Sequence, residues 1–332
     1  MENKCFDLYG IIAELDTPLW LSKALDRDFS YFTAAKGAAP ATLTLKVMEQ
    51  EAPFDRIPKV KACLYQPDSV SYEVQGVRYV DYFGKALSIY DYKLEKGELY
   101  SQDKALLHEL SYLILLSRVG EMLDKNGVHR VHSMGFSLDG KGVLCLMPQG
   151  GGKTTLCLEM LKGDKFKLLS DDTPLITRGA QLLPFPLRIG VSEGAKLDIS
   201  QEYLGSMDRR KHGKKILIDI RYYAGKISGP VPVEMIISCE RVYSDKPEIV
   251  EASKLTVFSA LFRDCIAGLG LPQMVEYFLR SDPKDLLSKT GIVVSRTLTC
   301  AKAVLKAKTY TLKLGTDTAR NAAALMEFAS RK

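Results

Sequence analysis

Hydrophobic and polar residues alternate with a period of two along much of the first hundred residues, a pattern typical of β-strands. The clearest case is the segment 71–80, which is rich in valine and tyrosine. Residues 3–15 and 41–48 are predicted to be further strands, and residues 18–27 a short helix. The pattern therefore predicts a β-rich α+β domain over residues 1–100.

After residue 100 the period changes to that of a helix. Apolar residues recur at intervals of three and four across 106–123, Ser101 offers an N-cap, and Gly127 provides a stop. This pattern predicts one long helix between Ser101 and Gly127. His108 lies within it beside apolar neighbours, so it is expected to be a partly buried structural side chain.

Beyond this helix, predicted strands and helices alternate. Strands are predicted over 131–138 and 142–147, and the second is almost wholly apolar, as expected of a strand buried on both faces of a sheet. A helix over 153–162 and a strand over 166–170 complete a βαβ-like unit. The remaining predicted elements are a hairpin over 173–183, strands over 216–222, 231–239 and 309–314, and helices over 252–263, 272–279 and 318–329. The predicted fold class is mixed α/β, with a second domain over residues 101–332.

Composition and charge exclude some classes of protein. With 332 residues, 46% of them hydrophobic, the chain can bury the cores of two domains, and it has no Pro/Gly/Ser-rich tract that would indicate a disordered arm. The net charge of +6 arises from 46 basic and 40 acidic residues that are interspersed along the chain. No polycationic surface, and hence no nucleic-acid partner, is expected.

Cysteine usage and the length of apolar runs predict a cytoplasmic location. The seven cysteines are scattered and never occur in a metal-ligand spacing, so reduced thiols are expected, with Cys145 and Cys157 as small buried residues. The N-terminus lacks the basic and apolar regions of a signal peptide, and the apolar runs, such as 113–116, are too short to cross a bilayer. No membrane partner is therefore expected, and a homo-oligomer is compatible with the sequence.

The most informative segment is 147–155, which has the sequence Met-Pro-Gln-Gly-Gly-Gly-Lys-Thr-Thr. It matches the GxxxxGK[ST] phosphate loop (P-loop) at every defined position except the first, where Met147 replaces glycine. The segment follows a buried strand and opens a helix. In that setting successive backbone N–H groups and the helix N-terminus point towards phosphates.

Each residue type in this loop suits phosphate binding for a physical reason. Gly150, Gly151 and Gly152 permit positive φ angles and the close backbone approach that a phosphate cradle needs. Lys153 is expected to reach the β- and γ-phosphates of ATP, and the Thr154 hydroxyl to coordinate Mg²⁺, with Thr155 as the next residue of the nucleotide-binding set. The alternative is a glycine-rich turn that binds nothing. The Lys-Thr-Thr sequence and the flanking strand and helix favour nucleotide binding.

Two adjacent carboxylates, Asp171 and Asp172, come directly after the strand that follows the P-loop helix. Because the carboxyl ends of neighbouring parallel strands line one crevice, these side chains are expected to approach the phosphates. One carboxylate can hold Mg²⁺ while the other orients or deprotonates an attacking hydroxyl. Asp-Asp pairs also occur as turn formers. Beside a P-loop, the functional interpretation is favoured.

Three other features leave two interpretations open. His132, which precedes the strand pair leading to the P-loop, is either a site residue or a hydrogen-bonded structural histidine. The basic cluster over 209–215 is either a solvated loop or a clamp for a triphosphate or an acidic peptide, and Arg188 has the same two interpretations.

Taken in order, His132-Ser133 and the segments 139–144, 150–154 and 169–172 resemble the catalytic domain of HPr kinase/phosphorylase and its relatives. In that family a histidine-containing strand, a glycine turn, a phosphate loop and an Asp-Asp strand end follow one another, as they do here. The resemblance covers residues 105–180 best. It implies a mixed α/β fold like that of phosphoenolpyruvate carboxykinase, in which the phosphate loop binds ATP.

The resemblance also implies a role for each site residue. Lys153 and Thr154 would bind phosphate and Mg²⁺, and Asp171 would act as the base towards a serine hydroxyl. Asp172 would assist the metal, and His132 would line the transfer site. The implied activity is that of an ATP- and Mg²⁺-dependent phosphotransferase, a serine kinase whose acceptor is a peptide or protein.

The chain departs from the family pattern at two loop positions. Met147 replaces the first loop glycine, and Thr155 stands where HPr kinases carry an acidic residue. The glycine-rich signature that follows the catalytic core in bifunctional HPr kinase/phosphorylases is also absent from the sequence, so phosphorolysis of phosphoserine is not implied. The chain looks nearer to HPr-kinase-related proteins, some of which phosphorylate serine in ribosomally made peptides such as lasso peptide precursors.

Two other functions stay open. One is a small-molecule kinase or carboxykinase-like enzyme, which would turn over a metabolite and no peptide. The other is a nucleotide-responsive regulatory module that binds ATP without turnover, and the irregular loop with Met147 is its main support.

Overall fold

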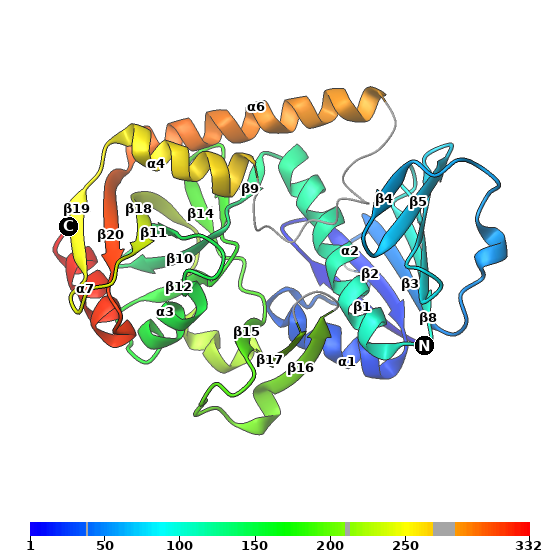
Figure 1. The fold of residues 1–332 in the computed structure, drawn as a ribbon, viewed down its shortest axis with the longest axis horizontal. Coiled ribbons are helices and arrows are strands. Elements are labelled where there is room, and N and C mark those ends of the chain that lie inside the picture. The colour runs from blue at the N-terminus through cyan, green and yellow to red at the C-terminus, as the bar shows by residue number, and fades with distance from the viewer. Residues whose placement is uncertain (38, 210–212, 268–282) are drawn as a thin grey trace. The chain divides into compact units, whose positions relative to one another are not determined.

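The computed structural model describes residues 1–37, 39–209, 213–267 and 283–332. The chain divides into two compact units (Figure 1). Helices account for about 34% of the residues and strands for about 35%, which confirms the mixed α/β fold class. Unit 1 comprises Met1–Leu123, Ser192–Arg221 and Pro272–Ser288, and unit 2 comprises Asp124–Val191, Tyr222–Leu271 and Lys289–Lys332.

Unit 1 is built on an eight-stranded sheet in the order β1-β2-β3-β8-β7-β6-β5-β4. Strands β2, β3 and β8 are parallel neighbours, and the other pairs are antiparallel. The strands are β1 (Glu2–Asp7), β2 (Ile12–Thr17), β3 (Leu43–Glu49), β4 (Leu64–Gln66), β5 (Ser69–Val74), β6 (Val77–Asp81), β7 (Ala86–Asp91) and β8 (Lys96–Ser101). Helix α1 (Leu19–Asp28) packs against β1 and β2, and strands β16 (Leu204–Arg209) and β17 (Gly213–Ile218) pair antiparallel in the same unit.

Two segments predicted as single strands are hairpins. The segment 3–15 folds back between β1 and β2 through Tyr9 and Gly10, whose φ angles are 60° and 83°. The segment 71–80 folds back between β5 and β6 through Gln75 and Gly76, with φ angles of 53° and 85°. Consecutive positive φ angles produce the tight turn that matches the twist of two antiparallel strands. The prediction was wrong because each segment has strand character on both sides of a glycine, Gly10 or Gly76, that closes a turn.

The long helix predicted between Ser101 and Gly127 is confirmed as α2 (Lys104–Lys125). It ends at Gly127, which takes a φ angle of 73°. Within unit 1, His108 is buried and its Nε2 lies 2.7 Å from Oδ2 of Asp28. This contact supports the structural interpretation of His108.

Unit 2 is built on a second mixed sheet in the order β12-β10-β11-β18-β14-β13-β9, with β20 paired to β18 and β19 paired to β20. Strands β11, β18 and β20 are parallel, and β10 lies antiparallel between β11 and β12. The strands are β9 (Val128–Arg130), β10 (Ser133–Leu138), β11 (Lys141–Leu146), β12 (Lys167–Ser170), β13 (Leu175–Thr177), β14 (Gln181–Leu183), β18 (Val231–Arg241), β19 (Glu248–Glu251) and β20 (Lys308–Leu314), with β15 (Ile189–Ser192) outside this sheet. Because β11 and β12 both oppose β10, all the long strands except β10 end at one edge of the sheet.

Helices cover both faces of this sheet (Figure 1). Helices α3 (Lys153–Met160) and α7 (Thr318–Arg331) pack together on one face. Helix α4 (Lys254–Leu261), a π-helical turn (Phe262–Ile266) and the part of α6 (Pro283–Lys306) that follows residue 288 cover the other face. The core of that second face joins residues from strands and helices, among them Leu144, Leu146, Leu169, Ile236, Val257, Leu261, Cys300 and Val304.

Most predictions for this half of the chain are confirmed. The strands over 131–138, 142–147 and 166–170, the hairpin over 173–183 and the closing strand and helix are present with small shifts of their ends. The strand predicted over 216–222 was wrong in its second half, because β17 ends at Ile218 and a 3₁₀-helix (Ile220–Lys226) follows. The helix predicted over 272–279 lies outside the described residues.

Helix α6 is the element that the hydropathy pattern does not predict. Its helical period is interrupted by Gly291 and by the β-branched run 292–294, both of which weaken helix propensity. Pro283 begins the helix, a position where the missing N–H carries no penalty. Packing of its apolar residues on the sheet therefore outweighs local preference.

The structure bears on two further expectations, the state of the cysteines and the length of apolar helices. None of the seven cysteines, all of which the structure describes, forms a disulfide, and Cys145 and Cys157 are buried as expected. In the described ranges, none of the helices is both long and apolar enough to cross a bilayer.

Candidate functional site

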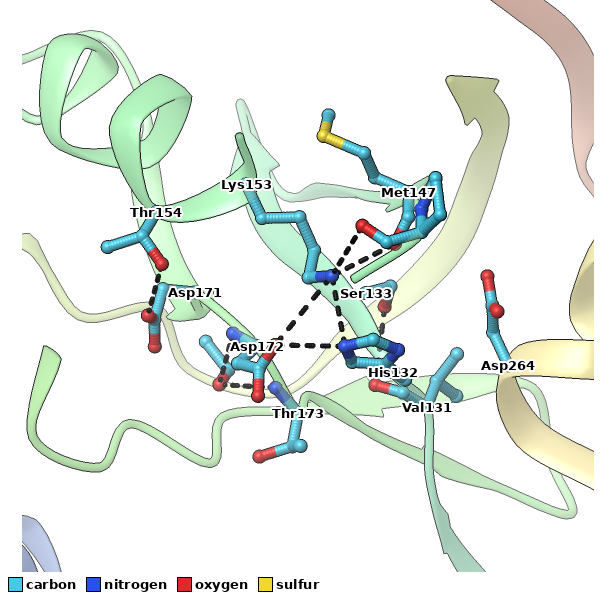
Figure 2. A network of polar contacts seen from close by, with 12 residues as sticks. Val131, His132, Ser133, Met147, Lys153, Thr154, Asp171, Asp172, Thr173 and Asp264 are labelled. Carbon is cyan, nitrogen blue, oxygen red and sulfur yellow. Dashed lines mark hydrogen bonds and ion pairs between the residues drawn. The ribbon is translucent and has the colours of Figure 1, made fainter. Parts of the chain in front are cut away.

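The residues singled out from the sequence meet at the carboxyl edge of the unit 2 sheet (Figure 2). Strand β11 ends here and is followed by the P-loop and Lys153, while β12 ends here and is followed by Asp171 and Asp172. Strand β10 runs the opposite way, so its start, with His132 just before it, lies at the same edge. The topology thus brings together three segments that are separate in the sequence.

The P-loop takes the backbone shape that its glycines allow. Gly150 and Gly152 have φ angles of 76° and 98°, and the Gly151 amide donates a hydrogen bond to the carbonyl of Pro148 at 3.0 Å. A Cβ atom on Gly151 would lie 2.6 Å from Cγ of Met147, so the loop closes tightly against that side chain. Side chains at these glycine positions would strain or block the turn.

Lys153 is folded onto its own loop. Its Nζ donates to the carbonyl of Met147 at 2.9 Å and lies 3.0 Å from Nε2 of His132. The residue is only 6% exposed. Burial lowers the pKa of Lys153 from its ordinary value, and the charges of Asp172 and Asp264 oppose this shift only in part. Met147, at the irregular first position of the loop, therefore contributes a carbonyl that holds the lysine.

Nε2 of His132 has two polar neighbours, the amino group of Lys153 and the carboxylate of Asp172. This nitrogen accepts from Lys153 when the ring is neutral there, yet it also lies 3.3 Å from Oδ1 of Asp172, which can only accept when ionised. Lys153 and Asp172 are themselves 3.8 Å apart, Nζ to Oδ1. Lysine, histidine and aspartate thus form one connected group of polar contacts.

The two aspartates occupy different surroundings. Asp171 is 7% exposed, and its Oδ2 accepts from the Thr154 hydroxyl at 3.5 Å, a long contact. The Asp172 side chain is 47% exposed and lies beside His132. The hydroxyl of Ser170 accepts from the amide of Thr173 at 3.0 Å and fixes the turn that carries both carboxylates.

Backbone contacts hold the segments of the site in register. The amide of Ser133 donates to the carbonyl of Asp172 at 3.0 Å, which ties the start of β10 to the Asp-Asp turn. The amide of His132 donates to the carbonyl of Asp264 at 2.9 Å. Both hydrogen bonds lie beside the catalytic candidates, so the geometry of the site depends on the main chain as well as on side chains.

Asp264 and Arg263 belong to this neighbourhood but were not predicted. The Asp264 side chain lies near His132 in Figure 2, is buried, and adds negative charge around Lys153. Nε and Nη2 of Arg263 donate hydrogen bonds to the carboxylate oxygens of Asp264 at 2.7 and 2.9 Å. Both residues lie in the π-helical turn, a feature often found at functional sites. The only sequence signal was an Arg-Asp pair inside an apolar run, which fits many buried ion pairs equally well.

Three other features that were singled out from the sequence lie outside the group formed by Lys153, His132 and Asp172. Thr155 lies in the first turn of α3 with an exposed side chain. Arg188 is partly buried in the same unit. In the basic cluster 209–215, residues 210–212 lie outside the described residues, and Lys214 forms an ion pair with Glu193 at 3.7 Å within unit 1.

Two oxygen-bearing side chains at the site are of the chemical kind that binds Mg²⁺ in proteins. Thr154 and Asp171 present a hydroxyl and a carboxylate to the same space, and Mg²⁺ is usually bound by one or two such groups together with phosphate oxygens. Among the residues that the structure describes, there is no cluster of three or more His, Cys, Asp or Glu side chains placed to hold a metal ion.

Comparisons with known proteins add nothing to this picture. No protein-family model matches the chain, and no curated protein matches it. The resemblance to HPr kinases therefore stays an expectation based on the motifs within residues 132–172, and the function is inferred from the geometry of the site.

Proposed function

We propose that the chain is an ATP- and Mg²⁺-dependent kinase that transfers the γ-phosphate to a serine hydroxyl of a peptide or protein, on a unit 2 fold of the HPr-kinase and phosphoenolpyruvate-carboxykinase kind. One observation supports this above the others. The glycine loop, Lys153, Thr154 and the two aspartates meet at the carboxyl edge of one sheet, where α/β folds bind their ligands.

The residues fit a nucleotide phosphate chain. The left-handed backbone at Gly150 and Gly152 opens the loop at the N-terminus of α3, where backbone N–H groups and the helix dipole favour anions. Lys153 is the cation within the loop. Its present acceptors include the neutral carbonyl of Met147, and an anionic phosphate oxygen is a stronger acceptor than a carbonyl.

Thr154 and Asp171 would hold Mg²⁺, since both offer oxygen ligands and lie in contact. When bound there, the metal would neutralise negative charge on the phosphates. This pairing reverses the division that the resemblance implies, in which Asp171 is the base and Asp172 assists the metal. Burial and the contact with Thr154 both favour Asp171 as the metal partner.

Asp172 is then the carboxylate that an acceptor can reach. Its side chain is half exposed and projects towards His132, so an incoming serine hydroxyl can hydrogen-bond to it. In the proposed step, serine Oγ bonds to the γ-phosphorus as the bond to the β-phosphate oxygen breaks, which yields phosphoserine and ADP. The hydroxyl proton passes to Asp172, and His132 and Lys153 stabilise that carboxylate beforehand.

The experiment is incubation of the protein with γ-labelled ATP, Mg²⁺ and a serine peptide library, alongside calorimetry with ATP. Lys153→Met should abolish both nucleotide binding and transfer. Lys162→Met is the matched control, because this exposed lysine of the same region pairs only with Glu159 at 2.6 Å among its described contacts.

The outcomes separate the alternative functions. Labelled peptide supports the serine kinase, whereas turnover of a metabolite without peptide labelling indicates a small-molecule kinase or carboxykinase-like enzyme. Binding of ATP without any transfer indicates a regulatory module. Absence of nucleotide binding by the unmodified protein overturns the proposal.

A further inference from the structure

Arg241 lies beside the P-loop although it is far from it in sequence. It is the last residue of β18, the strand parallel and adjacent to β11, with Ser238 opposite Leu146 in register. Strand β18 continues from Ser238 to Arg241 beyond the end of β11, so its last residue lies next to the loop that follows β11. This is the same sheet edge at which Lys153 and the aspartates meet.

The guanidinium of Arg241 touches the loop itself. Its Nη2 lies 3.4 Å from the carbonyl oxygen of Gly151. A Cβ atom on Gly152 would come within 2.8 Å of the same nitrogen, so the guanidinium occupies the space over the left-handed glycine at the start of α3. Gly152 therefore serves two purposes, a positive φ angle and room for this side chain.

The charge of Arg241 is not neutralised by a carboxylate of the described residues, and its side chain is exposed. Arg263, another arginine near the site, donates to both carboxylate oxygens of Asp264. The single long contact of Arg241 to a neutral carbonyl is weak compared with a charge-assisted pair. An arginine held in this way at a phosphate loop can exchange that contact for a phosphate oxygen.

We infer that Arg241 is a second cationic ligand for the phosphate chain of the nucleotide, acting from outside the loop while Lys153 acts from within it. This inference rests on the proposed function, because it assumes that the loop binds a nucleotide. The planar fork of arginine matches the geometry of phosphate oxygens, which lysine cannot reproduce. Arg241 should consequently contribute to affinity for the phosphates and not to recognition of the base.

The test is calorimetry with ATP·Mg²⁺, and separately with inorganic tripolyphosphate, on Arg241→Gln and Arg241→Lys. Loss of one charge-assisted pair predicts that Arg241→Gln weakens the binding of both ligands about ten- to hundredfold. Arg241→Lys should recover part of this loss, since it keeps the charge and loses the fork. The dependence of binding on salt should become shallower in Arg241→Gln, a change that a purely structural role would not produce.

Arg331→Gln is the matched control, since Arg331 is an exposed arginine of the same unit whose carboxylate partner is Glu327. It should bind both ligands as the unmodified protein does, and thermal unfolding of all variants checks that each is folded. If the unmodified protein binds ATP and Arg241→Gln binds it equally well, the inference about Arg241 fails and the kinase proposal stands. If the unmodified protein binds neither ligand, both fail.

Discussion

The division of labour between Asp171 and Asp172 is the sharpest consequence of the site geometry. Substitution of each by asparagine keeps the size of the side chain and removes its negative charge. With Asp172 as the proton acceptor, Asp172→Asn should lower kcat about 10²- to 10⁴-fold, the range found for positioned general bases. With Asp171 as the metal partner, Asp171→Asn should instead raise the Mg²⁺ concentration needed for half-maximal rate.

The size of the fall in kcat distinguishes the loss of proton transfer from the loss of an ion pair alone. Asp172 also forms an ion pair with Lys153 at 3.8 Å, and its side chain is 47% exposed. The Lys153 end of this pair is buried and the Asp172 end is open to solvent, so at 3.8 Å the pair contributes about 1 kcal/mol, equivalent to about fivefold in rate. A fall in kcat of a hundredfold or more corresponds to about 3 kcal/mol and exceeds what loss of that pair can produce.

The assay measures initial rates of peptide labelling at saturating ATP and peptide across a range of Mg²⁺ concentrations. Asp164→Asn serves as the control, because the Asp164 side chain is 92% exposed and pairs with Lys226. The reasoning is refuted if Asp172→Asn retains the rate of the unmodified protein at every Mg²⁺ concentration. It is equally refuted if excess Mg²⁺ restores Asp172→Asn but leaves Asp171→Asn inactive.

The remaining predictions concern the loop and the buried charges of unit 2. Gly152→Ala places a Cβ at a φ of 98°, so strain of about 1–2 kcal/mol should lower both the melting temperature and ATP affinity, whereas Gly163→Ala, with its nearest contact at 3.6 Å, should change neither. Calorimetric titration and melting curves test this, and equal behaviour of the two variants would contradict it. Arg296→Met leaves the buried Asp124 carboxylate without its cation, so the free energy of unfolding in urea should fall by about 3–5 kcal/mol, and a loss below about 1 kcal/mol would be inconsistent with this account. Burial alone would raise the pKa of Asp124, but the hydrogen bond with His129 and the charge of Arg296 outweigh it, and the pKa lies below its ordinary value of 3.8. The resulting stability is present above that value and lost as pH falls through the folded-state pKa, so urea midpoints should fall more steeply below pH 3.8 in the unmodified protein than in Asp124→Asn.

Much of the candidate site could be predicted from local sequence because its parts depend on short-range chemistry. An apolar strand, three glycines with Lys153, and a helix start form the P-loop within a dozen consecutive residues. The Asp-Asp turn likewise depends on β12 and on the nearby Ser170 hydroxyl. Local sequence did not predict which of the two aspartates is the proposed metal partner and which the proposed proton acceptor. The burial of Asp171 and the exposure of Asp172 arise from the packing around them.

The failures of prediction occurred where a non-local contact decides the outcome. The segment 71–80 has strand character on both sides of Gln75 and Gly76, and its second half, β6, pairs with both β5 and β7. Helix α6 forms despite Gly291 because its apolar residues, such as Val304, are buried on the sheet. For α6 the burial of apolar surface outweighs local backbone preference.

By itself, the sequence determined the strands and helix that flank the glycine loop, the phosphate-loop motif and the proximity of the loop to the aspartates. Only the tertiary structure decided that β18 lies beside β11, and hence that Arg241 reaches Gly151 from 90 residues away. Only the tertiary structure brought Asp264 to the backbone of His132. The physical reason is that strand order depends on the packing of the whole sheet and its covering helices, which no short stretch of residues encodes.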